Sequence, residues 1–427
     1  MSRLVVLGAS GLIGTEIVRR LAAEGHEVVA VARGARRVPQ GVEAVSTPFV
    51  DLGTDQLADL LATHRPGMVV NCTGVLQGAN TGEVHHAFVE RLIAACAALD
   101  PPPRLVHLSI PGSGADDETA FARTKRAAED SIRDSRLDFA ILRPGFVIAG
   151  AAYGGSALLR ALAASPFGMP QNHGARPFAP VAASDIARTV DWLARRERPL
   201  AATWDLVHPA PSTLDGVVEA HRAWIGGPRR RLALPGWLTT PGGWLSDLAG
   251  WFGWRPPTRS TALAELRRGI AGDPGPWIEA TGIAPLDAAN ALAQRPATVA
   301  DRWFARLYPL KAAVIAILAL FWIVSGVIAL VSYDQARAIL VAAGFPATLS
   351  HAVTWTTSLG DVAIGLLIAH RPTARLGLWA GIALSLLYLA SASVLAPLLW
   401  LDPVGSLVKT VPAILLMIVA LAMLDDR

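Results

Sequence analysis

Residues 3–14 read Arg3-Leu-Val-Val-Leu-Gly8-Ala-Ser-Gly11-Leu-Ile-Gly14, and this stretch decides the fold of the N-terminal part of the chain. The apolar run Leu4–Leu7 predicts a buried strand that ends at Gly8. From Ile13 onward the apolar positions recur at helical spacing, which predicts a helix. The glycines therefore stand where a strand turns sharply into a helix.

A turn of this kind favours phosphate, because free backbone N–H groups and the positive end of the helix point at the same place. Gly8 permits the tight turn, Gly11 lets a pyrophosphate approach the backbone, and Gly14 lets the helix pack closely on the strand. A dinucleotide cofactor is expected here, with a purely structural turn as the alternative. The predicted contacts are Gly8, Ser10, Gly11, Leu12, Ile13 and Gly14.

The end of the second predicted strand, residues 27–33, bears on the choice of cofactor. An acid at this place would bind the ribose hydroxyls of NAD, but the sequence has Arg33, followed by Arg36 and Arg37. A guanidinium suits a 2′-phosphate because its planar donors are permanently charged. The sequence therefore favours NADP(H) over NAD(H), with a solvated surface arginine as the alternative.

Strands and helices alternate regularly after this point. Helices are predicted over 55–63 and up to about Ala98, and strands over 68–74, 105–109 and 139–146. This rhythm predicts an α/β fold with a Rossmann-type doubly wound parallel sheet. A small capping region is expected to follow, with Gly154, Gly155 and the loop 167–176 lining a pocket above the strands. Ser184 and Asp185 are expected to cap a further helix.

Composition limits the classes of partner. The chain has 427 residues, enough for two or three domains, and its 52% hydrophobic content is concentrated beyond residue 310, which indicates a membrane portion. A net charge of +4 without a basic run interleaved with aromatic residues gives no sign of nucleic-acid binding. Cys72 and Cys96 lack metal-ligand spacing, so reduced buried thiols and no metal are expected. The first apolar run is too short for a signal peptide.

The G-x-x-G-x-x-G spacing of residues 8–14 resembles the extended and atypical short-chain dehydrogenase/reductase (SDR) families. Asp51-Leu52 resembles the pair that these proteins place by the adenine ring, and Asn71-Cys-Thr73-Gly74 resembles the element that closes the cofactor cleft. Arg143-Pro144-Gly145 is similar to the segment that leads toward the substrate half. Beside the glycine turn and Arg33, the resemblance implies cofactor contacts from Asp51, Leu52, Thr73, Gly74 and Lys125.

The same resemblance implies a catalytic tyrosine, a lysine four residues later and a serine near the end of the fifth strand. Lys125 is present, but the tyrosine position is Phe121, which cannot give a proton. Ser109 falls at the strand end, and Ser113 and Thr124 are alternative hydroxyls. Lys125 and Ser109 are therefore the catalytic candidates, and no catalytic acid is assigned.

Residues 229–303 are predicted to form a tryptophan-rich linker and capping segment. Trp237, Trp244 and Trp251 recur every seven residues, so a helix would place them near one face. This pattern indicates either a membrane interface or an aromatic seam packed on the N-terminal domain. Pro241 and the two glycines after it are expected to interrupt any continuous helix.

Four apolar runs after Trp303 are each long enough to cross a bilayer, which takes about 20 residues. They are Leu310–Ser332, Ala352–Ala369, Leu376–Leu399 and Val404–Leu424. Basic residues gather on the side of the N-terminal domain, as at Arg371 and Arg375. The positive-inside rule then predicts a multi-pass protein of the inner (plasma) membrane, with the SDR domain and the C-terminus in the cytoplasm.

The spans, including Phe321-Trp-Ile-Val-Ser325-Gly326 in the first, resemble the DoxX-like family of four-helix membrane proteins. An all-α domain with four transmembrane helices is accordingly expected over 304–427. The first 300 residues resemble atypical SDR proteins related to the NADPH-binding accessory subunit of respiratory complex I. With the SDR domain and its capping region assigned to 1–228, the chain looks like a bacterial fusion of the two families.

Asp361 lies in the middle of the second span, where a carboxylate is costly unless it is paired or hydrated. Lys409 enters the fourth span from the side at which the second begins, so one interpretation is a buried ion pair or a proton- or quinone-related site. The alternative is that Lys409 reaches back to the interface while Asp361 bonds to Ser358 or Tyr388.

Taken together, these features predict a membrane-anchored NADP(H)-binding oxidoreductase that acts on a lipid or quinone-like molecule. The missing tyrosine favours a second hypothesis, an NADPH-binding module that senses redox state without catalysis. A third is a membrane assembly factor in which the DoxX-like part carries the function. The expected partners are the lipid bilayer and a small hydrophobic substrate, and no oligomeric state follows from the sequence.

Overall fold

The computed structural model describes residues 3–34, 38–74, 82–112, 117, 119–166, 176–228, 232, 239–254, 256, 258, 259, 264, 265, 268–401, 403 and 405–424. The chain divides into two compact units. The sheet unit comprises Met1–Trp244 and Pro257–Ala305, and the helical unit comprises Leu245–Pro256 and Arg306–Arg427. The segment 229–303 is thus shared between the two units.

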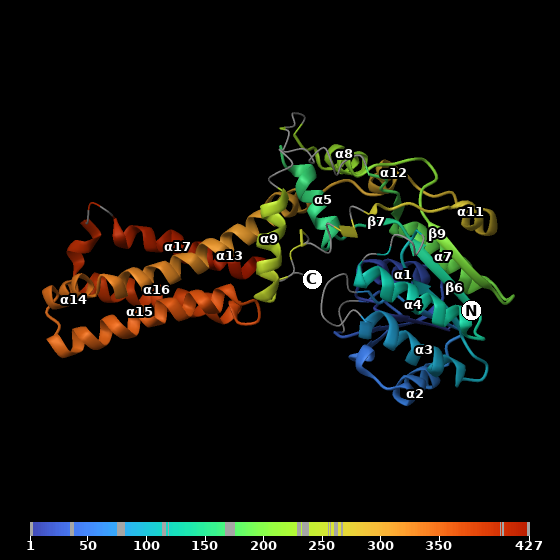
Figure 1. The fold of residues 1–427 in the computed structure, drawn as a ribbon, viewed down its shortest axis with the longest axis horizontal. Helices are drawn as coiled ribbons and strands as arrows, with labels where there is room; N and C mark the ends of the chain where they lie inside the picture. Colours follow the sequence, from blue (N-terminus) through green and yellow to red (C-terminus); the bar gives the residue numbers. More distant parts are fainter. Residues whose placement is uncertain are drawn as a thin grey trace. The chain divides into compact units, whose positions relative to one another are not determined.

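The sheet unit is built on seven parallel strands in the order β3-β2-β1-β4-β5-β6-β9 (Figure 1). The strands are β1 Arg3–Leu7, β2 Glu27–Ala32, β3 Glu43–Ser46, β4 Met68–Asn71, β5 Arg104–Leu108, β6 Phe139–Pro144 and β9 Ala201–Leu206. Because β1 lies between β2 and β4, the chain runs outward in both directions from the first strand. The predicted doubly wound parallel sheet is confirmed.

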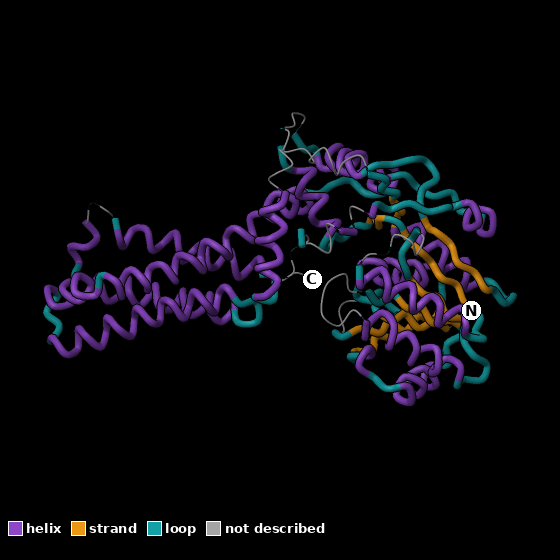
Figure 2. The backbone as a smooth tube through the Cα atoms, viewed as in Figure 1, coloured by secondary structure: helices purple, strands orange, loops and turns teal. Residues whose placement is uncertain are grey.

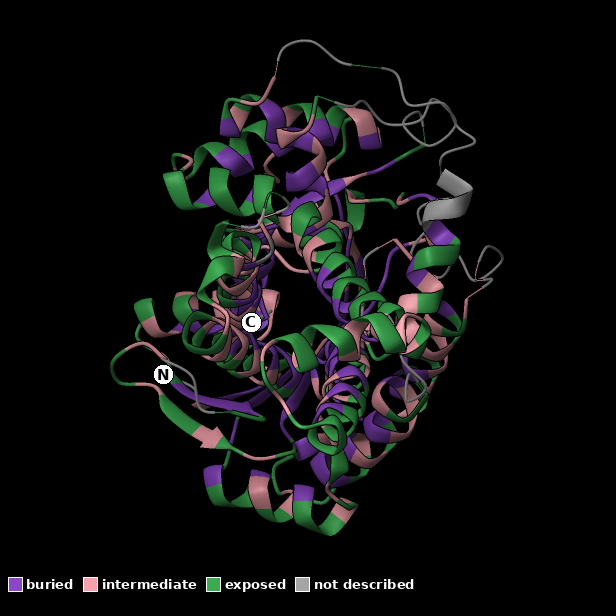
Figure 3. Cartoon of the chain, turned by 90° about the vertical axis from the view of Figure 1, so that its left-hand side faces the viewer, coloured by how far each residue is buried: buried purple, intermediate pink, exposed green. Residues whose placement is uncertain are grey.

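Alternate residues of β1 face two separate cores, which is why the strand reads as a continuous apolar run. Leu4 and Val6 pack with the helices α1 Leu12–Ala23 and α7 Ala183–Arg195. Val5 and Leu7 pack with α2 Thr54–His64, α3 Phe88–Ala97 and α4 Ala120–Asp134. Helices therefore cover both faces of the sheet, and its central strands are buried (Figures 2 and 3).

A smaller layer with its own apolar core follows β6. It contains β7 Phe146–Ile148, α5 Gly155–Ala164, β8 Pro180–Ala182, α8 Leu214–Ile225 and α12 Ala288–Ala293, and β7 pairs in parallel with β8. Helix α11 Gly275–Thr281 instead packs its Trp277 into the core that α1 and α7 share. The short helical turns elsewhere in this unit are η1 Phe49–Asp51 and the π-turn η2 Glu83–Ala87. This layer lies in the part of the chain where a capping region is predicted, and most of the loop 167–176 lies outside the described residues.

The predicted capping role of Ser184 and Asp185 is wrong. Helix α7 already begins at Ala183, so both residues lie within its first turn. The Asp185 carboxylate is buried and accepts hydrogen bonds from Arg188 at 2.6 Å and from the Leu286 backbone N–H at 2.8 Å. The Asp185 carboxylate thus binds the backbone of Leu286, about a hundred residues later in the chain, and the local sequence around Asp185 does not indicate this contact.

The helical unit consists of α13 Val299–Val331, α14 Tyr333–Ala342, α15 Ala347–Ala369, α16 Ala374–Leu395, the 3₁₀ turn η5 Pro397–Leu401 and α17 Ser406–Met423. Helix α9 Thr239–Trp251 also belongs to this unit from Leu245 onward, and α13 belongs to it from Arg306 onward. Among the described residues, α13, α15 and α16 are long and apolar enough to cross a membrane. Leu407–Met423 in α17 is a shorter apolar helix that coincides with the fourth predicted span.

Glycines set the spacing of these apolar helices. A Cβ at Gly326 of α13 would lie 2.4 Å from the Ser358 carbonyl oxygen of α15, and one at Gly365 would lie 2.7 Å from the Ala319 oxygen. Backbones that approach so closely gain dispersion contacts without needing a hydrophobic driving force. Large side chains instead point outward, as Leu387 does with 60% of its surface exposed. Such an arrangement suits a bundle whose solvent is lipid.

Helix α9 runs from Thr239 through Pro241 and the glycines that follow it, so the predicted interruption is wrong. Pro241 is the third residue of the helix. The first four N–H groups of a helix have no intrahelical partner, so a proline there removes no helical hydrogen bond. Trp237 lies outside the described residues.

Candidate functional site

The glycine turn after β1 has the geometry of a phosphate site. Gly8 adopts a φ of +80°, which favours glycine, and its carbonyl oxygen accepts the Gly11 N–H at 3.0 Å. Helix α1 begins at Leu12 with Gly11 as its N-cap, which supplies no side-chain cap. The first-turn N–H groups of α1 therefore remain for a ligand.

Gly14 explains how close the helix lies to the strand. A Cβ on Gly14 would sit 2.3 Å from Gly8 O, a separation that no side chain tolerates. A Cβ on Gly11 would meet only Gly8 O, at 3.2 Å, so the space in front of the turn is open. Ser10 is exposed beside it, and Leu12 and Ile13 are half-buried. The residues present therefore fit a dinucleotide pyrophosphate.

The expected adenosine-binding residues follow β2 and β3, the two strands on one side of β1. Arg33 follows β2 and is exposed, while Arg36 and Arg37 lie outside the described residues. Asp51 is exposed and Leu52 is half-buried at η1. The guanidinium of Arg91 fixes this turn by donating to Leu52 O at 3.1 Å and to Val50 O at 2.8 Å. Sequence reasoning did not single out Arg91, because its partners lie some 40 residues away.

The end of β4 is held by a buried amide. Asn71 Oδ1 accepts hydrogen bonds from the Thr73 backbone N–H at 3.0 Å and from its hydroxyl at 2.5 Å. Asn71 Nδ2 lies 3.1 Å from Nδ1 of His107 on β5. Thr73 is buried and Gly74 is exposed. The Asn71-Cys-Thr73-Gly74 element thus forms a rigid turn at the carboxyl end of the sheet, where cofactors bind in folds of this type.

Lys125 lies on α4 and points into this turn. Its Nζ donates to Thr73 O at 2.9 Å and to Leu108 O at 2.8 Å, and only 3% of the residue is exposed. Burial lowers the pKa of the Lys125 ammonium from its ordinary 10.5 to about 8, although the nearby Cys72 and Glu129 oppose this shift. Two main-chain carbonyls thus hold the ammonium beside Gly74.

Among the described residues, the position of the catalytic tyrosine beside Lys125 holds no proton donor. Phe121, one turn earlier on α4, packs its ring edge-on against His85 at 5.3 Å. Burial lowers the pKa of His85 to about 3, so this imidazole is neutral at physiological pH. The Thr124 hydroxyl lies within hydrogen-bonding distance of both Ala120 O and His85 Nδ1. Ser113, the other alternative hydroxyl, lies outside the described residues.

Ser109 follows β5, and its hydroxyl lies near the carboxylate of Glu129 on α4. The Ser109 hydroxyl is buried and has no hydrogen bond of ordinary geometry to any described residue. Burial opposes ionisation of Glu129, but hydrogen bonds from Arg143 and the proximity of Ser109 and Arg126 hold the pKa of its carboxyl below the usual value. Among the described residues, the Ser109 hydroxyl thus has Glu129 as its charged neighbour, and the Lys125 ammonium bonds to the Thr73 and Leu108 carbonyls.

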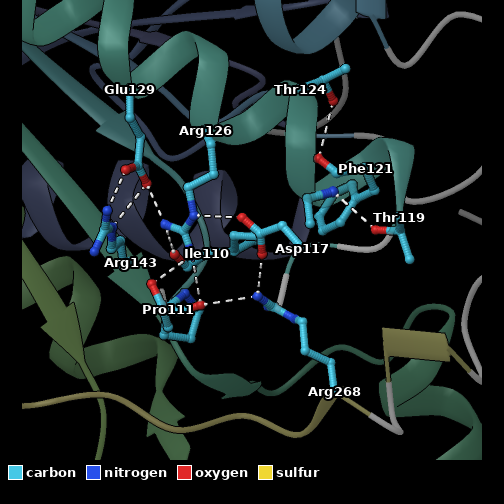
Figure 4. A network of polar contacts seen from close by, with 12 residues as sticks. Ile110, Pro111, Asp117, Thr119, Phe121, Thr124, Arg126, Glu129, Arg143 and Arg268 are labelled. Carbon is cyan, nitrogen blue, oxygen red and sulfur yellow. Dashed lines mark hydrogen bonds and ion pairs between the residues drawn. The ribbon is translucent and has the colours of Figure 1, made fainter. Parts of the chain in front are cut away.

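A network of ion pairs lies beside the loop that follows β5 (Figure 4). The buried Glu129 accepts from Arg126 at 3.0 Å, from Arg133 at 2.7 Å and from Arg143 Nε at 2.9 Å. Asp117 binds Arg126 at 2.9 Å and Arg268 at 2.8 Å. Sequence analysis identified Arg143 only through the Arg143-Pro144-Gly145 segment and missed the rest, because these residues come from four separate stretches of chain.

Arg126 ties this network to the loop after β5. Its guanidinium donates to Ile110 O at 2.9 Å, to Pro111 O at 3.0 Å and to Gly112 O at 2.7 Å. Three carbonyls and two carboxylates thus satisfy one side chain, which fixes the loop where a catalytic serine would otherwise lie. The network therefore holds residues 110–112 in place after β5.

The intramembrane carboxylate has neutral partners. Asp361 of α15 accepts hydrogen bonds from the Ser325 hydroxyl of α13 at 3.2 Å and from the Tyr388 hydroxyl of α16 at 3.0 Å. Lys409 is exposed and forms no ion pair with Asp361 within the part of the chain that is described. Asp361 was predicted either to pair with Lys409 or to bond to Ser358 or Tyr388, and the structure shows the bond to Tyr388. In the same described ranges, no group of three His, Cys, Asp or Glu residues is placed to hold a metal.

Two family matches divide the chain as the two units do. Residues 8–168 match the family described as NAD(P)H-binding, and residues 319–418 match the DoxX-like family. The sheet unit is thus an SDR-like, NAD(P)-binding domain. The whole chain joins this domain to a DoxX-like membrane domain with apolar helices.

Curated relatives match part of the chain. The dTDP-6-deoxy-L-talose 4-dehydrogenase (NAD(P)(+)) of Kitasatospora kifunensis is 33% identical over 184 residues, which are 38% of this chain and 58% of the relative. The probable dTDP-4,6-dihydroxy-2-methyloxan-3-one 4-ketoreductase of Streptomyces antibioticus is 32% identical over 168 residues, or 34% and 51% of the two chains. The chain therefore spans about half the length of the curated relatives it matches.

Solved structures share the fold. The NAD+ complex of Bordetella bronchiseptica WbmH matches with a TM-score of 0.53 and 14% identity, covering 72% of this chain and 98% of that one. The UDP-N-acetylglucosamine 4-epimerase of Bacillus cereus gives a TM-score of 0.51 at 13% identity over 69% of this chain and 95% of its own. MoeE5 in complex with UDP-glucuronic acid and NAD gives 0.51 at 20% identity, over 69% and 97%. At these identities the likeness establishes the fold alone.

Proposed function

We propose that the chain is a membrane-anchored NADP(H)-dependent oxidoreductase that reduces a lipid-soluble, quinone-like acceptor. The observation that carries this proposal is the pairing of an intact pyrophosphate turn, Gly8–Gly14, with Phe121 at the place of the proton donor. Bound NADPH supplies a hydride. The chain's own residues bind and orient the nucleotide, and Lys125 holds the Thr73 and Leu108 carbonyls beside it.

The chemistry of the acceptor follows from the missing acid. Hydride addition to a ketone produces an alkoxide, a strong base that needs a proton donor in the site. Hydride addition to a quinone produces a phenolate, a much weaker base that can take its proton from water. One hydride and one proton then convert the quinone to the quinol, and NADPH leaves as NADP+. A site with Phe121 and a neutral His85 suits the second reaction.

The cofactor preference and the membrane topology are further parts of this proposal. Arg33 lies exposed at the end of β2, where its guanidinium can bind a 2′-phosphate, so NADPH is preferred to NADH. The apolar helices cross the inner membrane, and the basic residues near Arg371 keep both termini in the cytoplasm. This placement gives the nucleotide site access to cytosolic NADPH and the bilayer access to a hydrophobic acceptor.

A second candidate function is an NADPH-binding redox sensor without turnover. The specific observation in its favour is Lys125, which bonds to two carbonyls of the chain itself and is almost fully buried. The Ser109 hydroxyl has Glu129 as its charged neighbour. In this case the bound nucleotide changes the state of the protein and leaves unoxidised.

Turnover of the full-length protein in lipid nanodiscs separates these candidates. The experiment follows NADPH absorbance with a short-chain quinone and, in parallel, with a dTDP-4-keto-6-deoxysugar, because the curated relatives act on dTDP-linked sugars. We expect oxidation with the quinone, none with the sugar, and none in a Gly11→Val variant. NADPH binding without turnover on either acceptor would support the sensor. Turnover on the sugar alone would overturn the quinone proposal.

A further inference from the structure

Helix α9 carries an exposed apolar stripe that the proposed function does not use. Its residues are Trp244, Leu245, Leu248, Trp251 and Phe252, whose surfaces are 78%, 66%, 49%, 86% and 41% exposed. At about 100° per residue, these five positions fall within about 120° of one helix face. Two tryptophans and three other large apolar side chains thus form one continuous band.

The opposite face of α9 is the covered one. Gly243 and Ser246 are buried and Gly250 is half-buried, and these positions lie about 180° from the band. A helix on the surface of a soluble protein buries its large apolar residues and shows its polar face to water. In α9 this order is inverted, so its outer face meets a medium less polar than water.

The end of α9 is fixed to one end of the membrane bundle. Phe252 O accepts the Arg371 backbone N–H at 2.9 Å, and Trp254 Nε1 donates to Ala369 O at 2.6 Å. The Arg371 guanidinium stacks over the Trp254 ring at 5.4 Å and donates to Leu424 O at 2.7 Å. Ala369 is the last residue of α15, and Leu424 directly follows α17, so α9 ends at the level where these two apolar helices end.

We propose that α9 is an interfacial helix whose occupant is the headgroup–acyl boundary of the bilayer around the bundle. Indole rings favour this depth because their faces are apolar and their N–H groups can stay wet. The bundle end to which α9 is fixed also carries Arg371 and Arg375, whose charges suit anionic headgroups. The inference rests on the proposed placement of the bundle in a membrane.

Spin labels on the full-length protein in nanodiscs test this proposal. Labels at Leu248→Cys and Trp251→Cys are compared with Leu387→Cys, exposed on the apolar α16, and Glu279→Cys, exposed on α11 in the sheet unit. The native Cys72, which is half-buried, and the buried Cys96 are first replaced by alanine, so that every label reports its new site. Collisions with oxygen, which enters bilayers, and with a nickel chelate, which stays in water, report the surroundings of each label.

We expect labels at 248 and 251 to collide more often with oxygen than with the nickel chelate, at a depth shallower than that of the label at 387. The label at 279 should collide more often with the nickel chelate than with oxygen. If 248 and 251 behave like 279, α9 lies in water and the proposal is wrong. If neither reagent reaches them, protein covers the band, either the sheet unit or a second copy, and the proposal is again wrong. A water-like result at 387 would instead overturn the membrane placement itself, so the two failures are distinguishable.

Discussion

Gly14 offers a quantitative test of how the glycine turn shapes the nucleotide site. A Cβ at this position would lie 2.3 Å from Gly8 O and 3.0 Å from the Ala9 Cα. Ordinary contacts begin near 3.4 Å, so in Gly14→Ala the first turn of α1 must move away from β1 by about 1 Å. The backbone of the turn cannot yield as a flexible side chain would.

The magnitude follows from two opposed effects. In an open helix position, Gly to Ala stabilises by up to about 1 kcal/mol. Overpacking costs about 1–3 kcal/mol, so we expect Gly14→Ala to lower the free energy of unfolding by up to about 2 kcal/mol. The shift also draws first-turn N–H groups away from a bound phosphate. One lost charge-assisted hydrogen bond costs about 1.5–3 kcal/mol, which weakens NADPH binding about ten- to a hundredfold.

The assay combines NADPH titration with thermal unfolding of the full-length protein. Gly216→Ala is the matched control, because Gly216 is exposed on α8 and a Cβ there meets its nearest atom at an ordinary 3.5 Å. This control should keep its affinity and unfold at the same or a higher temperature. Wild-type affinity and stability in Gly14→Ala would refute the reasoning, since the helix would then tolerate a side chain at its closest contact.

Three other predictions address the cofactor, a buried charge and the topology. Arg33→Ala should weaken NADPH binding about ten- to a hundredfold and leave NADH binding unchanged, and equal NADPH affinities in titrations of the two proteins would contradict this. Because burial holds the pKa of Lys125 at about 8 and the unfolded value is 10.5, the unfolded chain binds more protons between those pH values. As pH rises from 8 to 10.5, Lys125 should therefore increase the free energy of unfolding of the wild type by up to about 3 kcal/mol. The Lys125→Met variant should not show this increase. A difference in melting temperature between the two proteins that stays constant at every pH would contradict the prediction. In intact cells a maleimide should label Gln335→Cys from outside and Thr373→Cys only after permeabilisation, and outside labelling of 373 would rule out the proposed topology.

Local pattern predicts the parts of this fold that depend on neighbouring residues. The change of apolar period after Gly8 gives the strand, the turn and α1, and the repeated alternation gives the parallel sheet. The apolar run lengths give the membrane helices, although α17 is shorter than the other three. These features come from burial and backbone geometry within about 20 residues, which is the range a sequence pattern can report.

The remaining features depend on partners that are distant in sequence. The network around Glu129 joins Asp117, Arg143 and Arg268, and nothing near any one of them indicates the other three. Asp185 likewise bonds to the backbone of Leu286, a residue distant in sequence, and does not cap its helix. The proximity of Ser109 to Glu129 could not be predicted from the sequence either, because the two residues lie on different elements.

The most direct test of the account is a titration of NADPH and NADH into the full-length protein and its Gly11→Val variant. A Cβ on Gly11 meets Gly8 O at 3.2 Å, a few tenths of an ångström inside ordinary contact, and the φ of Gly11 is −75°, so the variant should fold with a small loss of stability. The branched side chain would occupy the space that the pyrophosphate needs. We expect the wild type to bind NADPH more tightly than NADH and the folded variant to bind neither. Unchanged NADPH affinity in the variant, or no binding by the wild type, would contradict the assignment of the glycine turn.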